Sequence, residues 1–178
     1  MKRYLLLASF ILCIVTTTAQ TSSDKGWWCA AEMHTAGFWY PPQVSNGILG
    51  LSFTNGYRFS EYIRIGVGFG VHATKEHGDY IYQSPYKLQS ASLPLFLNVR
   101  GSILSQESRK CVPYWNLDAG YAFLKNLFFF DAGIGMRVGG VRHSFVLSAN
   151  YFGQTVDVHY QKEAKFSNGI LFKIGYEF

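Results

Sequence analysis

The chain ends in the stretch Ile170-Leu171-Phe172-Lys173-Ile174-Gly175-Tyr176-Glu177-Phe178. Side chains alternate between the two faces of a strand, so one face collects the large apolar residues: Ile170, Phe172, Ile174, Tyr176 and Phe178. The other face carries Leu171, Lys173, Gly175 and Glu177. A strand of this kind is typical of a wall between lipid and a polar interior. The stretch therefore predicts a barrel that spans a membrane.

The opposite end of the sequence has the pattern of an export signal. Residues 1–3 include two basic residues, residues 4–15 are apolar, and residues 16–20 are small or polar. This pattern is typical of a secretory signal peptide, and the run is shorter than the about 20 residues of a spanning helix. We expect cleavage after Ala19, so that residues 1–19 are the signal peptide and 20–178 the barrel domain. Cys13 indicates a lipoprotein anchor only weakly, because Leu12 before it is bulky.

The charge of the chain is mild. Two of its 16 Lys and Arg residues leave with the signal peptide, so 14 remain against 11 Asp and Glu. An excess of this size, without a basic run, does not indicate a nucleic-acid partner. No stretch after residue 20 is long and apolar enough for a membrane helix. A spanning chain must then be a closed barrel, because an open sheet edge leaves backbone groups unpaired in lipid.

Alternation and turn residues predict the fold class, an all-β, closed, antiparallel, eight-stranded transmembrane barrel without helices. The predicted strands cover residues 27–40, 47–59, 62–75, 88–104, 112–124, 127–138, 142–156 and 170–178.

Charges decide which face of these strands turns inward. A soluble lipocalin-like barrel also alternates, with its apolar face inside. In a membrane barrel each Arg or Lys facing lipid at the midplane costs about 2–4 kcal/mol. The basic residues must then face the interior, where equally many acids match them in a structural network: Glu32, Arg64, Arg100, Asp118, Asp131, Arg137, Lys173 and Glu177. The signal peptide and Phe178 favour the membrane alternative.

A resemblance to a known family is carried by Tyr121, Gly133-Ile134-Gly135, Asn150-Tyr151 and Gly175-Tyr176-Glu177-Phe178. With these residues, the range 27–178 resembles the small eight-stranded outer-membrane barrels, the OmpX-like and OmpA-transmembrane-like group, and within it the Bacteroidetes type.

The resemblance implies an outer-membrane location with both termini in the periplasm. It places residues 41–46, 76–87, 125–126 and 157–165 outside the cell. Two connections depart from the family: 125–126 is short for an exterior loop, and 105–110 is long for an interior one. The implied partners are outer-membrane lipid, lipopolysaccharide, an unidentified envelope protein and the barrel-assembly machinery. That machinery would recognise a C-terminal assembly signal made of Phe172, Ile174, Tyr176 and Phe178.

Residues that could carry chemistry are few. Enzymes of the small-barrel type use His with Ser on one face, but His143 and Ser144 are adjacent and leave opposite faces. His72, His77 and His159 fall on or near exterior loops without a recurring metal-ligand spacing. His34 is expected to be a hydrogen-bonded lumen histidine. We therefore expect no catalytic site, no metal and no cofactor.

Other side chains predict structural features. Exposed lysines at the exterior end could meet lipopolysaccharide phosphates: Lys75, Lys87, Lys125, Lys162 and Lys165. Aromatic residues predict interface girdles: Trp27, Trp28, Trp39, Tyr40, Tyr57 and Trp115. A disulfide between Cys29 and Cys111 requires the 105–110 segment to fold under the barrel mouth.

The sequence thus favours an integral outer-membrane barrel with a side-chain-filled lumen and a structural, adhesion or assembly-subunit role. Two alternatives stay open at this point. One is a lipid A-modifying acyl-chain enzyme of the small-barrel type, and the other is a conduit for small solutes or hydrophobic ligands.

Overall fold

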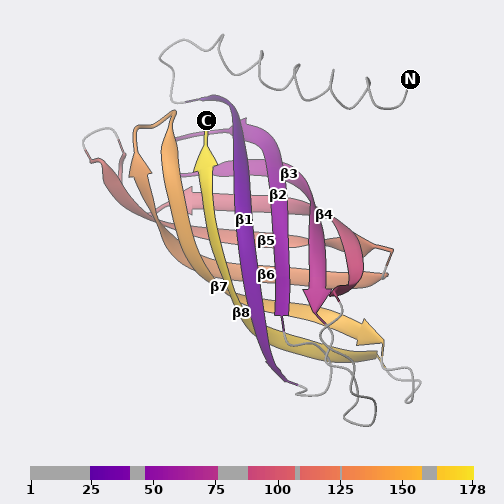
Figure 1. Cartoon of the computed structure of the whole chain (residues 1–178). Coiled ribbons are helices and arrows are strands. Elements are labelled where there is room, and N and C mark those ends of the chain that lie inside the picture. Colours follow the sequence, from indigo (N-terminus) through magenta and orange to yellow (C-terminus); the bar gives the residue numbers. More distant parts are fainter. Residues whose placement is uncertain (1–24, 41–46, 76–87, 107–108, 125, 158–163) are drawn as a thin grey trace, which may run out of the picture.

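The computed structural model describes residues 25–40, 47–75, 88–106, 109–124, 126–157 and 164–178. Eight antiparallel strands follow one another around a closed barrel, in which β8 pairs with β1 (Figure 1). Their bounds are β1 Gly26–Tyr40, β2 Gly47–Arg58, β3 Arg64–Lys75, β4 Leu88–Ser102, β5 Cys111–Phe123, β6 Leu127–Gly139, β7 Ser144–Asp157 and β8 Ala164–Glu177. The predicted fold class is confirmed.

Strand ends differ from the prediction by six residues at the start of β8 and by at most two residues elsewhere. β8 begins at Ala164, six residues before the expected start, because β7 continues to pair with it as far as Asp157. β3 begins at Arg64 rather than at residue 62. Here Ser60 Oγ accepts hydrogen bonds from the backbone N–H groups of Tyr62 and Ile63, both at 3.2 Å, and holds these residues in a turn.

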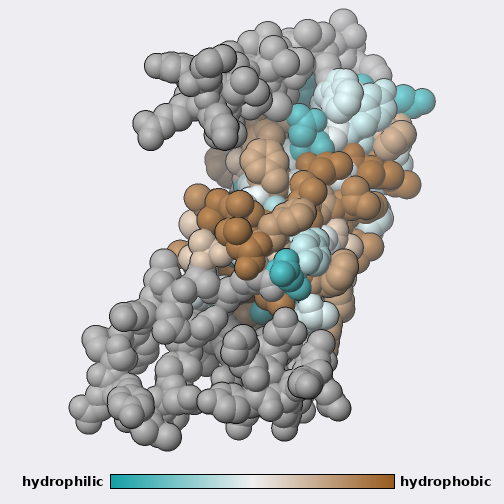
Figure 2. Space-filling view, turned by 90° about the vertical axis from the view of Figure 1, so that its right-hand side faces the viewer, coloured by the Kyte–Doolittle hydropathy of each residue, from teal (hydrophilic) through white to brown (hydrophobic). Residues whose placement is uncertain are grey.

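The outer surface of the barrel is apolar. Leu97, for example, is 61 % exposed and Ile134 is 69 % exposed, although both lie in the middle of a strand. Figure 2 shows a band of hydrophobic residues across the middle of the face in view, with hydrophilic residues gathered above it. A soluble barrel places such side chains inside, so the polarity of this barrel is the reverse of the soluble kind.

The interior is divided along the barrel axis. Toward the end where β1 stops and β2 starts, the lumen is filled by buried apolar side chains: Ala36, Ile48, Phe96, Ala122, Phe129, Phe152 and Leu171. Toward the end that carries the start of β1 and the finish of β8 (Figure 1), the lumen is filled by charged side chains. We call the second one the termini end.

The girdle prediction needs one correction. Trp27 and Trp115 are exposed on the outside, and Trp27 packs edge-on against Tyr57 at 5.9 Å. Trp28 instead points into the lumen, where its ring lies 4.8 Å from Cζ of Arg100. It is inward because it alternates with Trp27 along β1. The side chains of residues 39 and 40 lie outside the described part. No helix among the described residues is long and apolar enough to cross a membrane.

Candidate functional site in the barrel lumen

The carboxylate of Glu177, near the end of β8, is the centre of the charged half. Arg64 on β3 donates to Oε2 at 2.5 Å, and Arg100 on β4 donates to Oε1 at 2.8 Å. Arg137 on β6 donates to both oxygens, at 2.7 and 3.2 Å. All four side chains are buried. One acidic group therefore links the last strand to three strands elsewhere in the wall.

A second carboxylate completes this cluster. Glu32 on β1 accepts two hydrogen bonds from Arg100, at 3.2 and 3.0 Å, in a fork-to-fork arrangement. Arg100 Nε also donates to Asn98 Oδ1 at 2.9 Å. Because every donor of Arg100 meets a partner or the Trp28 ring, its charge is compensated inside the barrel.

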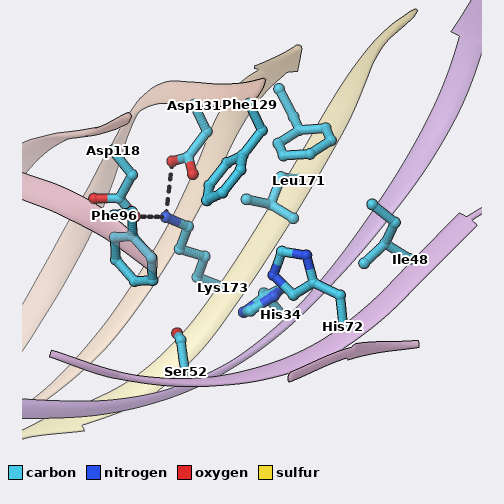
Figure 3. A pocket seen from close by; sticks show the side chains of 11 residues that line it. His34, Ile48, Ser52, His72, Phe96, Asp118, Phe129, Asp131, Leu171 and Lys173 are labelled. Atoms are coloured by element: carbon cyan, nitrogen blue, oxygen red, sulfur yellow. Dashed lines mark hydrogen bonds and ion pairs between the residues drawn. The ribbon is translucent and has the colours of Figure 1, made fainter. Parts of the chain in front are cut away.

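Lys173 on β8 forms a separate bridge deeper in the lumen. Its Nζ lies 2.6 Å from Asp118 Oδ2 and 2.7 Å from Asp131 Oδ1 (Figure 3). Asp118 and Asp131 are direct neighbours across β5 and β6, so without a cation between them they would repel each other. Asn98 and Asn150 donate further hydrogen bonds to the two carboxylates.

All eight predicted lumen residues take part in these ion pairs. The lumen also contains two polar residues that the sequence did not predict there. Arg58 is buried on β2 beside Arg64 and donates to the carbonyl of Val141 at 2.8 Å. Its place on the inward face follows from the same alternation and could have been found. The interior therefore holds five basic and four acidic described residues rather than four of each.

The second missed residue is Gln106, which no strand pattern could indicate. It belongs to a strap, residues 103–110, that joins β4 to β5 across the termini end; residues 107–108 lie outside the described part. Gln106 is only 3 % exposed and donates to Gly140 O and Ser144 Oγ, both at 2.8 Å. The strap thus closes this mouth of the lumen with a side chain.

Glu61 holds the strap from outside. Its Oε2 accepts a hydrogen bond from Ser105 Oγ at 2.7 Å. The hydrogen bonds from Ser105 and then Tyr62 lower the pKa of this carboxyl below its ordinary value of 4.5. The charged form of Glu61 therefore favours the strap in this position.

Two histidines lie between the charged and the apolar halves. His34 on β1 and His72 on β3 meet edge to face, with ring centroids 4.7 Å apart, over Gly50 of β2. They border a chamber of about 10 Å³, enough for about one water molecule, together with Lys173 and Phe129 (Figure 3).

Two expectations for these histidines are wrong. His72 is in the lumen rather than near a solvated loop, because it alternates inward along β3. Neither ring nitrogen of His34 has a hydrogen-bond partner among the described residues, although a hydrogen bond was expected.

The disulfide that the sequence left open is not formed: no bond joins Cys29 to Cys111. Cys29 lies on β1 and Cys111 on β5, which are on opposite sides of the eight-stranded barrel. A bridge needs Cα atoms within about 7 Å. The strap inserts Gln106 rather than drawing Cys111 across the mouth.

His143 and Ser144 are separated by the barrel wall. The His143 ring stacks on Tyr176 outside at 6.1 Å, whereas Ser144 bonds to Gly140 and Gln106 inside. Within the described ranges, no group of three or more His, Cys, Asp or Glu residues is placed to hold a metal ion. His77 and His159 lie outside the described residues, as do the side chains of the five exterior lysines.

No protein-family model matches the chain, and no curated protein matches its sequence. Solved outer-membrane barrels, however, resemble it in fold, and three of them are OprG, the N-terminal domain of OprF and Neisserial surface protein A. The outer membrane protein OprG from Pseudomonas aeruginosa has a TM-score of 0.53 at 10 % identity, over 87 % of this chain and 95 % of OprG.

The N-terminal β-barrel domain of Pseudomonas aeruginosa OprF has a TM-score of 0.49 at 12 % identity, over 85 % of this chain and 97 % of that domain. Neisserial surface protein A has a TM-score of 0.49 at 12 % identity, over 89 % of this chain and 98 % of that protein. At such identities the resemblance is one of fold, so the chain has the closed eight-stranded architecture of the outer-membrane barrel OprG.

Proposed function

We propose that this chain is an exported, integral outer-membrane protein with both termini in the periplasm. It acts through its outer surface and loops, in a structural, adhesion or assembly-subunit role. The observation that carries this proposal is the reversed polarity of the barrel. Arg64, Arg100, Arg137 and Lys173 are buried inside, while apolar side chains cover the outside. An apolar outer surface of this kind is suited to contact with membrane lipid.

The filled lumen supports a surface role rather than a conduit. The Glu177 cluster and Gln106 occupy the termini end, and Phe96, Phe129 and Phe152 pack at the other end. Between them lies the chamber of about 10 Å³. An eight-stranded barrel is narrow enough to be filled by side chains in this way.

The described residues give no support to the acyl-chain enzyme. Nucleophilic catalysis requires a base within hydrogen-bond reach of the hydroxyl. His143 and Ser144 lie on opposite faces of the wall, and the lumen histidines share a chamber with carboxylates that are already paired with Lys173.

The end of β8 supports recognition by the barrel-assembly machinery. Phe172 and Ile174 are each 53 % exposed on the outer face, and Tyr176 follows on the same face. Phe178 exchanges two backbone hydrogen bonds with Cys29, at 2.8 and 2.9 Å, and so continues the seam between β8 and β1. Membership of the OmpX-like family and the Bacteroidetes type stays part of this proposal.

Fractionation of a Gram-negative host that expresses the full chain tests the location. We expect the protein in the outer membrane, with heat-dependent migration on gels and an epitope inserted directly after residue 20 accessible only after the outer membrane is opened. Recovery from the periplasm in soluble form would overturn the proposal.

Two further measurements address the role. Planar-bilayer conductance should stay at the background level, and steady channels would favour the conduit. Native mass spectrometry of protein extracted from its own outer membrane should then show whether a stoichiometric protein partner exists. A partner would define an assembly subunit, and an altered lipid A acyl profile on gene deletion would overturn the non-enzymatic role.

A further inference from the structure

A single small residue interrupts a row of aromatic side chains on the outer face. The row crosses five neighbouring strands in register, from β7 through β8, β1 and β2 to β3: Phe145, Tyr176, Ala31, Phe53 and Phe69. Ala31 is the only member of this row without a ring. The methyl group of Ala31 therefore forms the floor of a notch between Tyr176 and Phe53.

The notch belongs to a larger hollow of about 730 Å³, which is within the about 300–1,000 Å³ of small-molecule sites. Phe53, Phe69 and Leu51 form one wall, and Phe145, Tyr176 and Ile174 form the other. Met33, which is 50 % exposed, bounds the hollow toward the middle of the barrel.

Phe178 lies next to two residues of the hollow, Phe53 and Tyr176, on the side of the termini end. Its ring lies 6.4 Å from Phe53 and 6.3 Å from Tyr176, so aromatic rings surround Ala31 on three sides. β8 and β2 flank β1 at about 4.8 Å each, so the two walls stand about 10 Å apart at the backbone. Side chains from both walls narrow this space to a slot along the strand direction, the shape of an extended hydrocarbon chain.

The surface beside the hollow is positively charged. The turn between β6 and β7 carries Arg142 and His143, both exposed, and the His143 ring stacks on Tyr176 of the hollow wall at 6.1 Å. Among the described residues outside the lumen at the termini end, the cations are Lys25, Arg109, Lys110 and Arg142, and the single acid is Glu61. Such a rim complements a phosphate group.

We propose that this hollow binds an anionic glycerophospholipid, with one acyl chain over Ala31 and the phosphate at Arg142 and His143. This inference rests on the proposed membrane location, which puts the apolar walls in lipid. With the termini in the periplasm, the bound lipid belongs to the periplasmic leaflet.

The test uses the full chain in detergent micelles that contain a known amount of phosphatidylglycerol, and native mass spectrometry counts the lipid retained. Ala31→Phe fills the notch. Ala119→Phe is the matched control, because Ala119 is also an outward alanine, set between Leu97 and Phe130 on the opposite side of the barrel. We expect the wild type and Ala119→Phe to keep one lipid and Ala31→Phe to lose about tenfold in retention. Equal retention by the two variants would overturn the proposal.

The headgroup half is tested separately. Arg142→Gln combined with His143→Ala should weaken retention of phosphatidylglycerol, whereas Lys110→Gln should not, and the wild type should keep diacylglycerol less well than phosphatidylglycerol. Equal retention of the two lipids would show that the phosphate is not recognised.

Heat-dependent migration of each variant shows whether its barrel is intact. If Ala31→Phe does not fold, the smaller Ala31→Leu takes its place with Ala119→Leu as control. If the wild-type barrel is intact and in the outer membrane but keeps no lipid, the lipid site is overturned and the proposed function stands. If the wild type is recovered in soluble form, both proposals are overturned, so the two failures are distinguishable.

Discussion

Arg137 donates two hydrogen bonds across the lumen to the carboxylate of Glu177, from Nε at 2.7 Å and from Nη2 at 3.2 Å. Arg64 and Arg100 donate to the same carboxylate from two further strands. The carboxylate that compensates three buried arginines is therefore carried by the strand that closes the barrel against β1.

Glu177→Gln should be strongly destabilising, because it leaves three buried cations with only Glu32 as a carboxylate in their cluster. Breaking a buried ion pair costs about 3–5 kcal/mol. Urea unfolding in phospholipid vesicles, followed by tryptophan fluorescence, measures the change in the free energy of unfolding. Glu61→Gln, at a half-buried carboxylate near the barrel rim, should change it by less than about 1 kcal/mol. A loss below that limit for Glu177→Gln would mean that water compensates the arginines.

Lys173→Met should also destabilise the barrel, because Asp118 and Asp131 then face each other without a cation. Adding Asp131→Asn removes the repulsion and should restore at least about 1 kcal/mol, within the usual range of coupling between neighbours. The same unfolding assay gives the coupling energy. Strict additivity of the two substitutions would show that Lys173 does not act as the bridge.

Gly50→Ala should destabilise by about 1–3 kcal/mol through overpacking. A Cβ at residue 50 would overlap Nε2 of His34 and lie 2.7 Å from Cδ2 of His72. His34→Ala in the same chain makes room and should recover most of the loss. The thermal midpoint of folded barrel on gels reports both effects. Gly140→Ala is the control, since a Cβ there meets nothing within 4 Å.

Leu97→Arg should cost about 2–4 kcal/mol, because Leu97 faces outward in the middle of β4 and would place a charge at the bilayer midplane. Phe59→Arg, at the termini end, should cost about 0–1 kcal/mol. Unfolding in vesicles separates the two values. Similar costs for both positions would contradict a membrane-spanning placement of β4.

The strap should loosen in acid. The pKa of Glu61 is lowered in the folded protein, so its contribution is complete above the ordinary value of 4.5 and is lost as the pH falls through the lowered pKa. The amide of Ile103 bonds to Pro113 O at 2.9 Å, and its protection factor against hydrogen exchange, which is corrected for the intrinsic pH dependence of exchange, should therefore fall at low pH. Glu61→Gln should remove this pH dependence. An unchanged profile in the variant would assign the loosening to another group.

Local alternation determined which residues share a face of each strand, and the charges on one face determined that this face turns inward. Lys173 and Glu177 are inside and Ile174 and Tyr176 outside because successive side chains of a strand leave opposite faces. The same rule already implied the inward positions of Trp28, Arg58 and His72. The period of two therefore predicted the fold class, the eight strands and the strand side chains that lie in the lumen.

Only closure of the barrel decided which inward groups meet. Glu177 is far in sequence from Arg64 and Arg100, and tilt and stagger of the strands bring their side chains to one level. Gln106 lies in a connection without periodicity, so its place under the mouth depends on the strap's contacts with Glu61 and Ser144. The notch at Ala31 likewise exists because β8 and β2 set aromatic rings beside it. Alternation is a property of one strand, whereas pairing across a lumen is a property of all eight.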